Sequence, residues 1–476
     1  MAAIANTLAS AGAEVSQLSN MHLPPLPTES LPGMAPVPVK NTQASARRVI
    51  SRTPHAPSPV FALPVEITAQ IFIDCLVELA EPDPLSAPLL LGNICSHWRH
   101  VALSTPRLWS SFNKTLPQDS PRTPFLLELL QIWLSRSGLH PLTLSFRYAE
   151  IRIRPTPDPF HRIILQHAHQ WQDVGFHLPH ADLAQLFDEF AGTFPLLKSL
   201  TIASQDAETT AALSFASLRS SPFLRILRTC GDLLRPMPSS IPWSGLTRFH
   251  VCDFTPTQAH ELFRLAPSLQ ECTLRITERG DFVGSSLPPL LELRVLDMST
   301  RLSLLPCLTL PALQRLSSVS LDDDTDVSEF LSFLTRSGCA LTHLHLFAMG
   351  LDESRFIDLC TTLPNLVDLG LWTFASPHSN PIVLLLHGRN RYLPCLTALE
   401  LNTHVLVNYE LLADMLESRS GIDADGVAQL QSFRLNLLPW IQKIQRPEPR
   451  TLDRFKKLME RGMRIMSSGM GGPLFE

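Results

Sequence analysis

The chain carries little charge of either sign and little glycine. Only 17% of its 476 residues are Asp, Glu, Lys or Arg, and the formal net charge is -5. That balance lacks the basic surplus expected of a nucleic-acid-binding protein. Its 20 glycines are few for an all-β protein built on tight hairpins. The 45% of hydrophobic residues instead supports a large core, in a chain too long for one ordinary domain unless it is a solenoid.

Paired cysteines and long apolar runs are also missing. The nine cysteines, from Cys75 to Cys395, form no C-x-x-C pair and mostly lie inside apolar runs, as reduced buried thiols do in intracellular proteins. No run reaches the roughly 18 apolar residues of a membrane span, and the N-terminus lacks the basic segment of a signal peptide. We therefore expect a cytoplasmic or nuclear protein with no membrane partner.

Catalytic motifs are absent as well. The chain has no phosphate-binding G-x-x-x-x-G-K-[ST], no G-x-G-x-x-G, no G-x-S-x-G and no H-E-x-x-H. Five histidines between 161 and 180 lack the helical i, i+4 spacing and the nearby cysteine of a metal site, so we interpret them as surface residues. The sequence predicts a non-catalytic protein with no metal and no cofactor.

Residues 1–58 are rich in Pro, Ser and Ala and show no sustained apolar period, which is typical of a disordered tail. The tail contains a basic cluster of Arg47, Arg48 and Arg52. This cluster is either a nuclear import patch or part of a solvated linker.

Residues 63–109 have the pattern of three short helices. Pro64 suits a first helical turn, and Ile67, Ile71 and Phe72 follow as one apolar stripe. A second stripe comprises Leu90, Leu91, Ile94, Cys95 and Trp98. Leu108 and Trp109 are expected to pack back after Pro106 ends it. Because so short a segment buries little surface alone, we expect it to need a partner or a neighbouring domain.

A hexapeptide, L-x-x-L-x-L, recurs along the rest of the chain. The clearest copies start at Leu197, Leu293, Leu341, Leu366 and Leu396. Weaker copies start at Leu139, Trp171, Leu224, Leu246, Leu269, Leu316 and Leu430. From Leu197 onward the spacing runs from 22 residues (Leu224 to Leu246) to 34 (Leu396 to Leu430), near the 20–29 of leucine-rich repeats. Helical stretches followed by proline separate the copies, so an irregular α/β solenoid is predicted over 116–438.

The repeat also predicts which side chains face outward. The fourth and sixth positions point into the core, so positions three, five and seven face the concave surface. Phe347 and Trp372 then lie side by side in neighbouring repeats, flanked by His343 and His345. Exposed neighbouring aromatics are typical interface anchors, which makes these four residues the candidate substrate site. The alternative is that Phe347 and Trp372 turn inward.

Residues 439–476 are basic, with an apolar edge that includes Leu452, Phe455 and Leu458. Solenoids need capped ends, so a helix covering the last repeat is expected here. A helix that binds a membrane surface or an acidic partner is the alternative.

The stretch 63–109 resembles an F-box. The residues that carry the resemblance are the Leu63-Pro64-x-Glu66-Ile67 opening, the Ile71-Phe72 pair, the Cys95-x-x-Trp98-Arg99 core and the Pro106-x-Leu108-Trp109 close. The run from Ala87 to Phe112 is similar to the F-boxes of the large families in mushroom-forming (basidiomycete) fungi that carry leucine-rich repeats behind them. The resemblance departs in the long join at 77–87 and in the Pro-rich tail.

This resemblance implies a protein-interaction function. An F-box, here 59–115, binds a Skp-type adaptor of a cullin–RING (SCF) ubiquitin ligase, and the repeats present a protein substrate for ubiquitin-dependent degradation. By position, Leu63, Pro64, Glu66, Ile67, Ile71 and Phe72 meet the adaptor first. Cys95, Trp98, Leu108 and Trp109 build the module and part of the interface. The alternative function is a repeat scaffold without a ligase role.

Overall fold

The computed structural model divides the chain into two units. The chain separates into Met1–Pro59 and Val60–Glu476, and all described residues belong to the second unit. They are 63–76, 81–116, 123–148, 158–204, 213–276, 284–300, 302–321, 323–348, 351–373, 379–403, 408–421, 427–437 and 447–468. The predicted disordered tail, including Arg47, Arg48 and Arg52, lies outside them.

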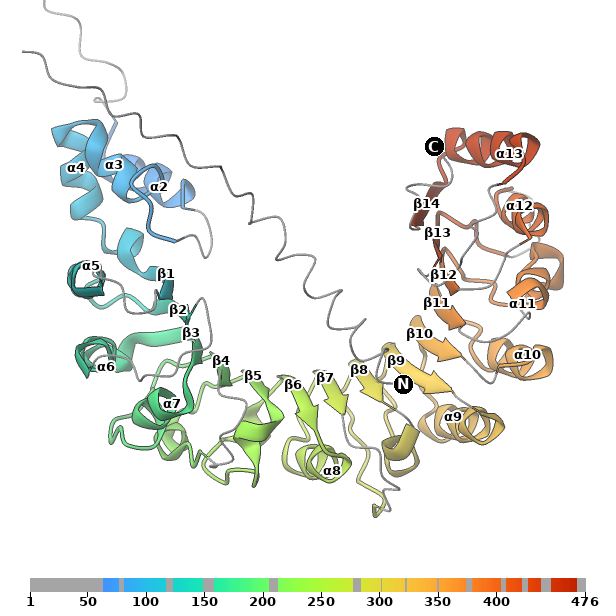
Figure 1. Cartoon of the computed structure of the whole chain (residues 1–476), viewed down its shortest axis with the longest axis horizontal. Helices are drawn as coiled ribbons and strands as arrows, with labels where there is room; N and C mark the ends of the chain where they lie inside the picture. The colour runs from blue at the N-terminus through green and yellow to red at the C-terminus, as the bar shows by residue number, and fades with distance from the viewer. Residues whose placement is uncertain are drawn as a thin grey trace, which may run out of the picture. The chain divides into compact units, whose positions relative to one another are not determined.

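A single parallel sheet of fourteen strands runs through this unit, and the strand order equals the sequence order (Figure 1). The strands are β1 (Ser111–Leu116), β2 (Leu142–Tyr148), β3 (Trp171–Leu178), β4 (Ser199–Ser204), β5 (Ile226–Cys230), β6 (Arg248–Phe254), β7 (Glu271–Ile276), β8 (Val295–Thr300), β9 (Arg315–Leu321), β10 (His343–Ala348), β11 (Asp368–Thr373), β12 (Ala398–Thr403), β13 (Ser432–Leu437) and β14 (Arg464–Ser468). Each strand pairs only with its neighbours along the chain, which is a solenoid-like α/β arrangement.

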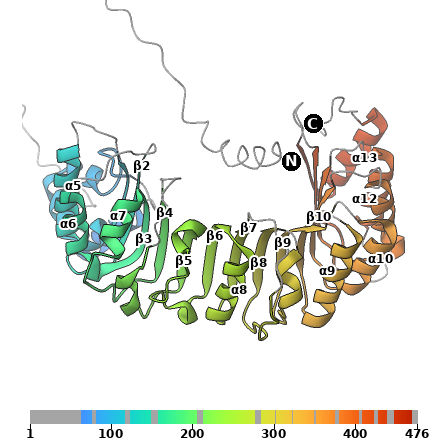
Figure 2. The same cartoon turned by 60° about the horizontal axis from the view of Figure 1, so that its bottom comes forward.

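Helices precede the sheet and lie between several of its strands. They are α2 (Val65–Asp74), α3 (Leu89–Ile94), α4 (Ser96–Leu103), α5 (Thr123–Arg136), α6 (Asp158–Gln166), α7 (His180–Phe187), α8 (Pro256–Leu265), α9 (Asp324–Ser337), α10 (Glu353–Thr362), α11 (Ser379–Leu385), α12 (Tyr409–Ser418) and α13 (Pro449–Glu460). Short 3-10 helices include η3 (Pro106–Trp109). The strands line the inner side of the arc and α5 to α12 its outer side (Figure 2).

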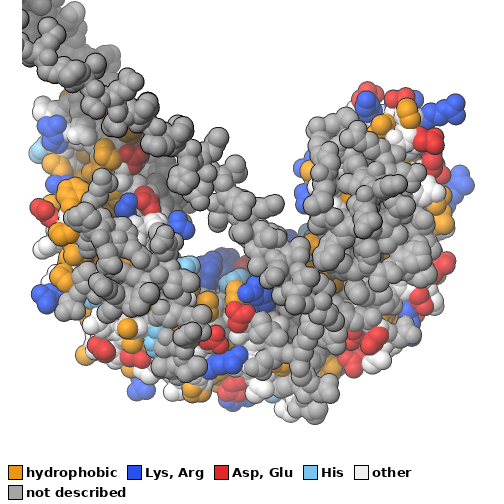
Figure 3. Space-filling view, in the orientation of Figure 1, with side chains coloured by type: hydrophobic (Ala, Val, Ile, Leu, Met, Phe, Trp, Pro, Cys, Tyr) orange, Lys and Arg blue, Asp and Glu red, His pale blue; other side chains and the backbone are white. Residues whose placement is uncertain are grey.

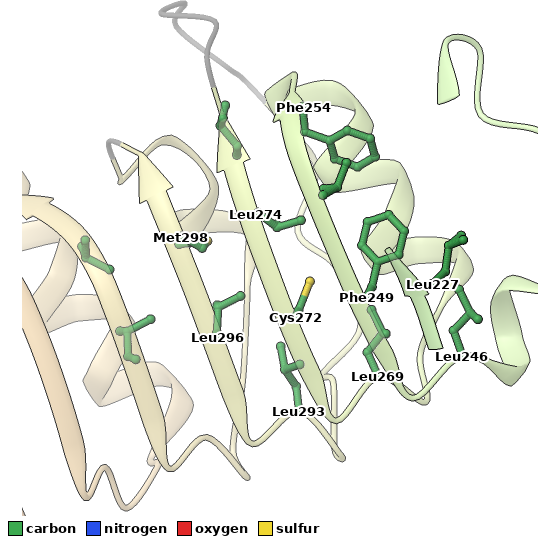
Figure 4. Packing of buried hydrophobic residues seen from close by; sticks show 14 of the residues in the cluster. Leu227, Leu246, Phe249, Phe254, Leu269, Cys272, Leu274, Leu293, Leu296 and Met298 are labelled. Carbon is green, nitrogen blue, oxygen red and sulfur yellow. The ribbon is translucent and has the colours of Figure 1, made fainter. Parts of the chain in front are cut away.

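The hexapeptide pattern accounts for where most strands begin and which of their residues are buried. Strands β4 to β8 and β10 to β13 each begin two residues after the first residue of a copy, and in each the fourth residue of the copy is buried. Equivalent residues stack in rows: Leu246, Leu269 and Leu293 at position one, and Phe249, Cys272 and Leu296 at position four (Figure 4). Each fully buried Leu or Phe contributes about 1.5–3 kcal/mol, so the rows supply the main stabilisation.

Two strands contain bulges that the pattern did not predict. In β9 the register shifts around Ser318, which has a positive φ of 64°, and Asp253 in β6 has a φ of 61°. Leu316 pairs with Leu296 and is therefore the fourth residue of its copy. The start assigned to Leu316 was wrong by three residues, because the extra residue of the bulge disguised the alternation; this copy starts at Leu313.

The sheet also extends past the repeats at both ends. β1 begins at Ser111, inside the segment 59–115 that the resemblance assigned to an F-box. β14 lies inside the segment 439–476 that was assigned to the C-terminal cap. Neither strand carries the leucine pattern; β1 has only Phe112 and Leu116 buried. The capping helix expected in 439–476 corresponds to α13, which packs on α12, and residues 438–446 lie outside the described part.

Helices α2, α3, α4 and η3 (63–109, the helical module) share a core with the first strands. The ring of Trp109 lies 4.8 Å from that of Trp133 on α5, and Phe112 lies 5.4 Å from Trp133 on its other side. The Nε1 of Trp133 donates a hydrogen bond to the Ser111 carbonyl at 3.0 Å. Glu81 accepts a hydrogen bond from the Thr115 backbone N–H at 2.9 Å. These contacts fix the helical module on the end of the sheet.

Among the described residues, no helix is both long enough and apolar enough to cross a membrane.

Candidate functional site

Helix α2 presents an apolar face to solvent. Ile67 and Ile71 are about half exposed, at 50% and 46%, and Leu63 and Val65 at the start of the helix are 37% and 45% exposed. Pro64 and Glu66 are exposed beside them. The opposite side of α2 packs through Phe72, which is 1% exposed and whose ring lies 4.9 Å from that of Trp98 on α4. Residues four apart share one helix face, so Ile67 and Ile71 lie in a row on α2, and the exposed Leu63 precedes the helix.

The second predicted stripe is divided between two helices. Cys95 has an extended backbone (φ -156°) and caps α4, its sulfur accepting a hydrogen bond from the Trp98 backbone N–H at 3.4 Å. The expectation of one continuous stripe from Leu90 to Trp98 was therefore wrong. The break at Cys95 leaves Leu90 and Ile94 of α3 exposed, at 38% and 52%, while Leu91 is buried.

The structure divides the ten predicted adaptor contacts into three groups. Leu63, Pro64, Glu66, Ile67 and Ile71 are exposed, and Cys95 and Trp98 are half-buried. Phe72, Leu108 and Trp109 are at most 2% exposed. The placement of Phe72 among the first adaptor contacts was therefore wrong, because its side of α2 faces α4. Leu108 and Trp109 likewise support the module from inside.

Exposed apolar side chains are concentrated in this module. Of the sixteen large hydrophobic side chains that are exposed among the described residues, eight lie between 63 and 103. They are Leu63, Val65, Ile67, Ile71, Leu85, Leu90, Ile94 and Leu103. In the space-filling view, hydrophobic side chains gather on the side of α4 and α5 (Figure 3). Large contiguous apolar patches are uncommon on the surface of monomeric proteins, so this concentration makes the module a candidate interaction surface.

The predicted aromatic pair lies on the inner face of the sheet. Phe347 and Trp372 are register partners on β10 and β11, their ring centroids are 5.0 Å apart, and both are half-buried. Leu344, Leu346 and Ala348 point into the core instead. The alternative in which Phe347 and Trp372 turn inward is thus not the one observed.

His343 and His345 lie on the same face as the aromatic pair. The Nε2 of His345 is 3.6 Å from Oδ1 of Asp368 on β11, and this hydrogen bond raises the pKa of His345. The imidazole occupies space over Gly370, where an added Cβ would meet it at 2.8 Å. Burial raises the pKa of Asp368, but the pairing with His345 and the positive charges of His345, His343 and Arg315 together outweigh burial and leave the pKa lowered. The two shifts together favour the oppositely charged pair, with His345 protonated and Asp368 ionised.

An amide network continues this face beyond Trp372, and the sequence analysis did not single it out. Asn402, the register partner of Trp372, donates a hydrogen bond to Glu400 Oε1 at 3.0 Å. Asn436 donates to the same Glu400 oxygen at 3.0 Å and to Asn402 Oδ1 at 2.7 Å. Ser468 donates to Asn436 Oδ1 at 2.7 Å. Its only signal in the sequence was Asn at position seven of two consecutive copies.

The histidines between 161 and 180 are not all on the surface. His161 is 4% and His180 8% exposed, and His161 Nε2 lies 3.7 Å from Oδ1 of the buried Asp182. The surface interpretation was wrong for these two residues, because α6 and α7 turn them toward the sheet. The described residues contain no group of three or more His, Cys, Asp or Glu side chains placed to hold a metal ion.

A scan against models of protein families found none that matches the chain. A search of curated proteins likewise found no similar sequence.

Proposed function

We propose that this protein is the substrate-receptor subunit of an SCF-type ubiquitin ligase and is itself non-catalytic. The helical module binds a Skp-type adaptor, and through it a cullin–RING ligase, while the inner face of the solenoid binds a protein substrate. The observation that carries the proposal is the exposed pair Ile67 and Ile71 on α2, with the exposed Leu63 just before the helix, within a module whose sequence resembles an F-box. Large exposed aliphatic side chains in a row are unfavourable unless a partner covers them.

The size of the exposed face suits a protein partner. Ile67, Ile71 and Ile94 each leave about half of the side chain in water. Full burial of such a side chain is worth about 1.5–3 kcal/mol, so completing the burial of several supplies a substantial part of a typical binding free energy.

The junction between the helical module and the solenoid supports a presenting role. Trp109 packs edge-on against Trp133 of α5, and the Arg136 guanidinium lies 4.7 Å from the centre of the Trp109 ring. A shared aromatic core holds the two parts at a fixed angle. A ligase receptor needs that property, because its substrate must be held in a fixed position relative to the adaptor.

The test is a pull-down with a purified Skp-type adaptor, comparing the wild type with Ile67→Glu/Ile71→Glu. Both side chains are half exposed, so the variant alters the surface while Phe72 keeps its packing. Leu291→Glu is the matched control, because Leu291 is a 69% exposed aliphatic residue outside the module.

We expect the wild type and Leu291→Glu to retain the adaptor and the double variant to lose it by at least about tenfold, since buried charge is strongly disfavoured. No retention by the wild type would overturn the proposal and favour a repeat scaffold without a ligase role. Equal retention by all three would exclude α2 as the docking face.

A further inference from the structure

A second group of side chains on the inner face, on strands away from the aromatic pair, is basic. By the register of β2 to β7, the exposed charged or titratable side chains in line with positions five and seven are Arg147, His177, Arg228, His250 and Arg275. Arg147 pairs with His177 and therefore lies at position seven, so the copy start assigned to Leu139 was wrong by two residues. We call these five residues the basic strip. The carboxylates of Asp173 and Glu271 lie at position three, nearer the start of their strands. Figure 3 shows Lys, Arg and His side chains gathered in the hollow above β4 to β6.

Among the described residues, two of the three arginines in the basic strip have no carboxylate oxygen within 4.0 Å. Within the described part of the chain, Arg228 has no carboxylate oxygen within 4.0 Å. Arg147 donates from Nε to the hydroxyl of Thr115 at 3.2 Å, and only Arg275 lies near a carboxylate, 3.5 Å from Asp253. Guanidinium groups that are exposed and unpaired are available to an incoming anion.

Among the described residues, the negative charge beside the strip comes from Asp253, near Arg275, and from Asp173, whose pKa burial raises and Lys198 and Arg228 lower in part. Burial lowers the pKa of His177 and His250, and Arg147 and Arg228 respectively lower it further, so both imidazoles are neutral at pH 7. Burial raises the pKa of the Cys230 thiol to about 11, so this register partner of Cys252 carries no negative charge. The first carboxylate at position five toward the C-terminus is Asp297 on β8, which ends the strip.

We propose that the basic strip binds an extended polypeptide segment rich in Asp and Glu. Neighbouring strands lie about 4.8 Å apart, so the arginines from β2 to β7 are spread over roughly 24 Å. One phosphate group is too small to meet Arg147 and Arg228 together, whereas carboxylates along a segment of about seven extended residues match that spread. The inference deepens the proposed function, on which it rests for the role of this segment as part of a substrate.

The same geometry relates the basic strip to the aromatic pair. From Arg228 on β5 to Phe347 on β10 there are five strand-to-strand steps, again about 24 Å, or about seven extended residues. A substrate segment that joins an acidic run to a large apolar residue about seven positions away therefore reaches both the basic strip and the Phe347–Trp372 pair.

The experiment measures fluorescence anisotropy of a fluorescein-labelled peptide of alternating Glu and Ser with the purified full chain. A peptide with Gln in place of Glu is the ligand control. The variants are Arg147→Glu/Arg228→Glu, the milder Arg228→Gln, and Arg464→Glu as the matched control on β14, an exposed inner-face arginine outside the strip. A further peptide carries Leu seven residues from the acidic run, and its control carries Leu two residues away.

We expect the Glu peptide to bind, and to lose about tenfold or more in affinity with the double reversal and several-fold with Arg228→Gln. Arg464→Glu should bind as the wild type does, and binding should weaken from 50 to 300 mM salt because exposed charges are screened. The peptide with Leu at seven residues should bind several-fold tighter than its control.

Equal binding of the Glu and Gln peptides, or no loss with either strip variant, would overturn the inference. Tighter binding of a single-stranded oligonucleotide than of the Glu peptide, lost in the same variants, would reassign the strip to nucleic acid. Because no ligase component is present, failure here is distinct from failure of the adaptor pull-down.

Discussion

At the scale of single residues, Arg419 is an unusual element of the core. Its side chain is 0% exposed, and it donates hydrogen bonds to the carbonyls of Leu386, Leu393 and Tyr392 at 2.5, 3.2 and 2.5 Å. Burial lowers the pKa of Arg419. One guanidinium thus donates to three carbonyls of the loop between α11 and β12, of which the Leu393 carbonyl also accepts from the Leu396 backbone N–H.

Replacing Arg419 with Met should lower the free energy of unfolding by about 3 kcal/mol or more, because three carbonyls lose a charged donor at once. Equilibrium urea denaturation measures the change. Arg219→Met is the control, since Arg219 is exposed and its loss should cost at most about 0.5 kcal/mol. Equal midpoints for the two variants would contradict a structural role for Arg419.

A second residue-scale prediction concerns His345 and Asp368. The raised pKa of His345 means that its stabilising effect is fully present below its ordinary pKa of 6.5 and is lost as the pH rises through the folded-state pKa. Asp368, with a lowered pKa, contributes above its ordinary pKa of 3.8 and loses that contribution as the pH falls through its folded-state pKa. The pair is therefore strongest in mildly acidic solution.

The wild type should accordingly be more stable than His345→Gln at pH 5, and this advantage should shrink at pH 9. Unfolding midpoints in urea at the two pH values measure it. His140→Gln, at an exposed site before β2, is the control and should show no such difference. If the stability advantage of the wild type over His345→Gln grew toward pH 9, the assigned direction of the His345 pKa shift would be refuted.

At the scale of elements, the contact between α2 and α4 decides whether the helical module keeps its shape. Phe72 is 1% exposed, whereas Trp98 is only half-buried. The two rings meet at 4.9 Å, and Leu108 and Trp109 complete the core beneath them. The buried Phe72 therefore holds in place the helix that carries the exposed row of Ile67 and Ile71.

Phe72→Ala should destabilise the module by about 3–5 kcal/mol through the cavity it leaves, and Trp98→Ala by less, because part of the indole is already in water. Amide hydrogen exchange along α2 measures both effects, and Ile71→Ala serves as the surface control. Faster exchange in Trp98→Ala than in Phe72→Ala would reverse this order and invalidate the assignment of Phe72 as the main support.

At the scale of the whole molecule, the alternation of the hexapeptide predicted most of the sheet, because one period-two pattern determines both the strand and its buried face. Leu274 in the core and Arg275 on the inner face follow from it directly. The alternation did not predict β1, because its two buried residues, Phe112 and Leu116, are too few to form a pattern. The bulge at Ser318 and the helix break at Cys95 were also missed, because each depends on backbone geometry set by neighbouring elements.

Part of the candidate site could likewise be predicted from the sequence. The aromatic pair follows from side-chain alternation, and the exposed face of α2 from helical spacing. Which side of α2 faces α4 could not be predicted, because Ile71 and Phe72 are equally apolar in the sequence. The basic strip was missed for another reason: Arg147, Arg228 and Arg275 are far apart along the chain and lie together only through the register of the strands.

The identity of strand order and sequence order has a consequence for synthesis of the chain. In a growing polypeptide, the upstream neighbour of each new strand has already been synthesised, usually some 20 to 30 residues earlier. Pairing with that neighbour requires no downstream residue. Contacts of such short sequence separation form early, and domains fold as units from the N-terminus during translation. The sheet is therefore suited to assembly strand by strand as it leaves the ribosome, with the helical module and β1 as the first template.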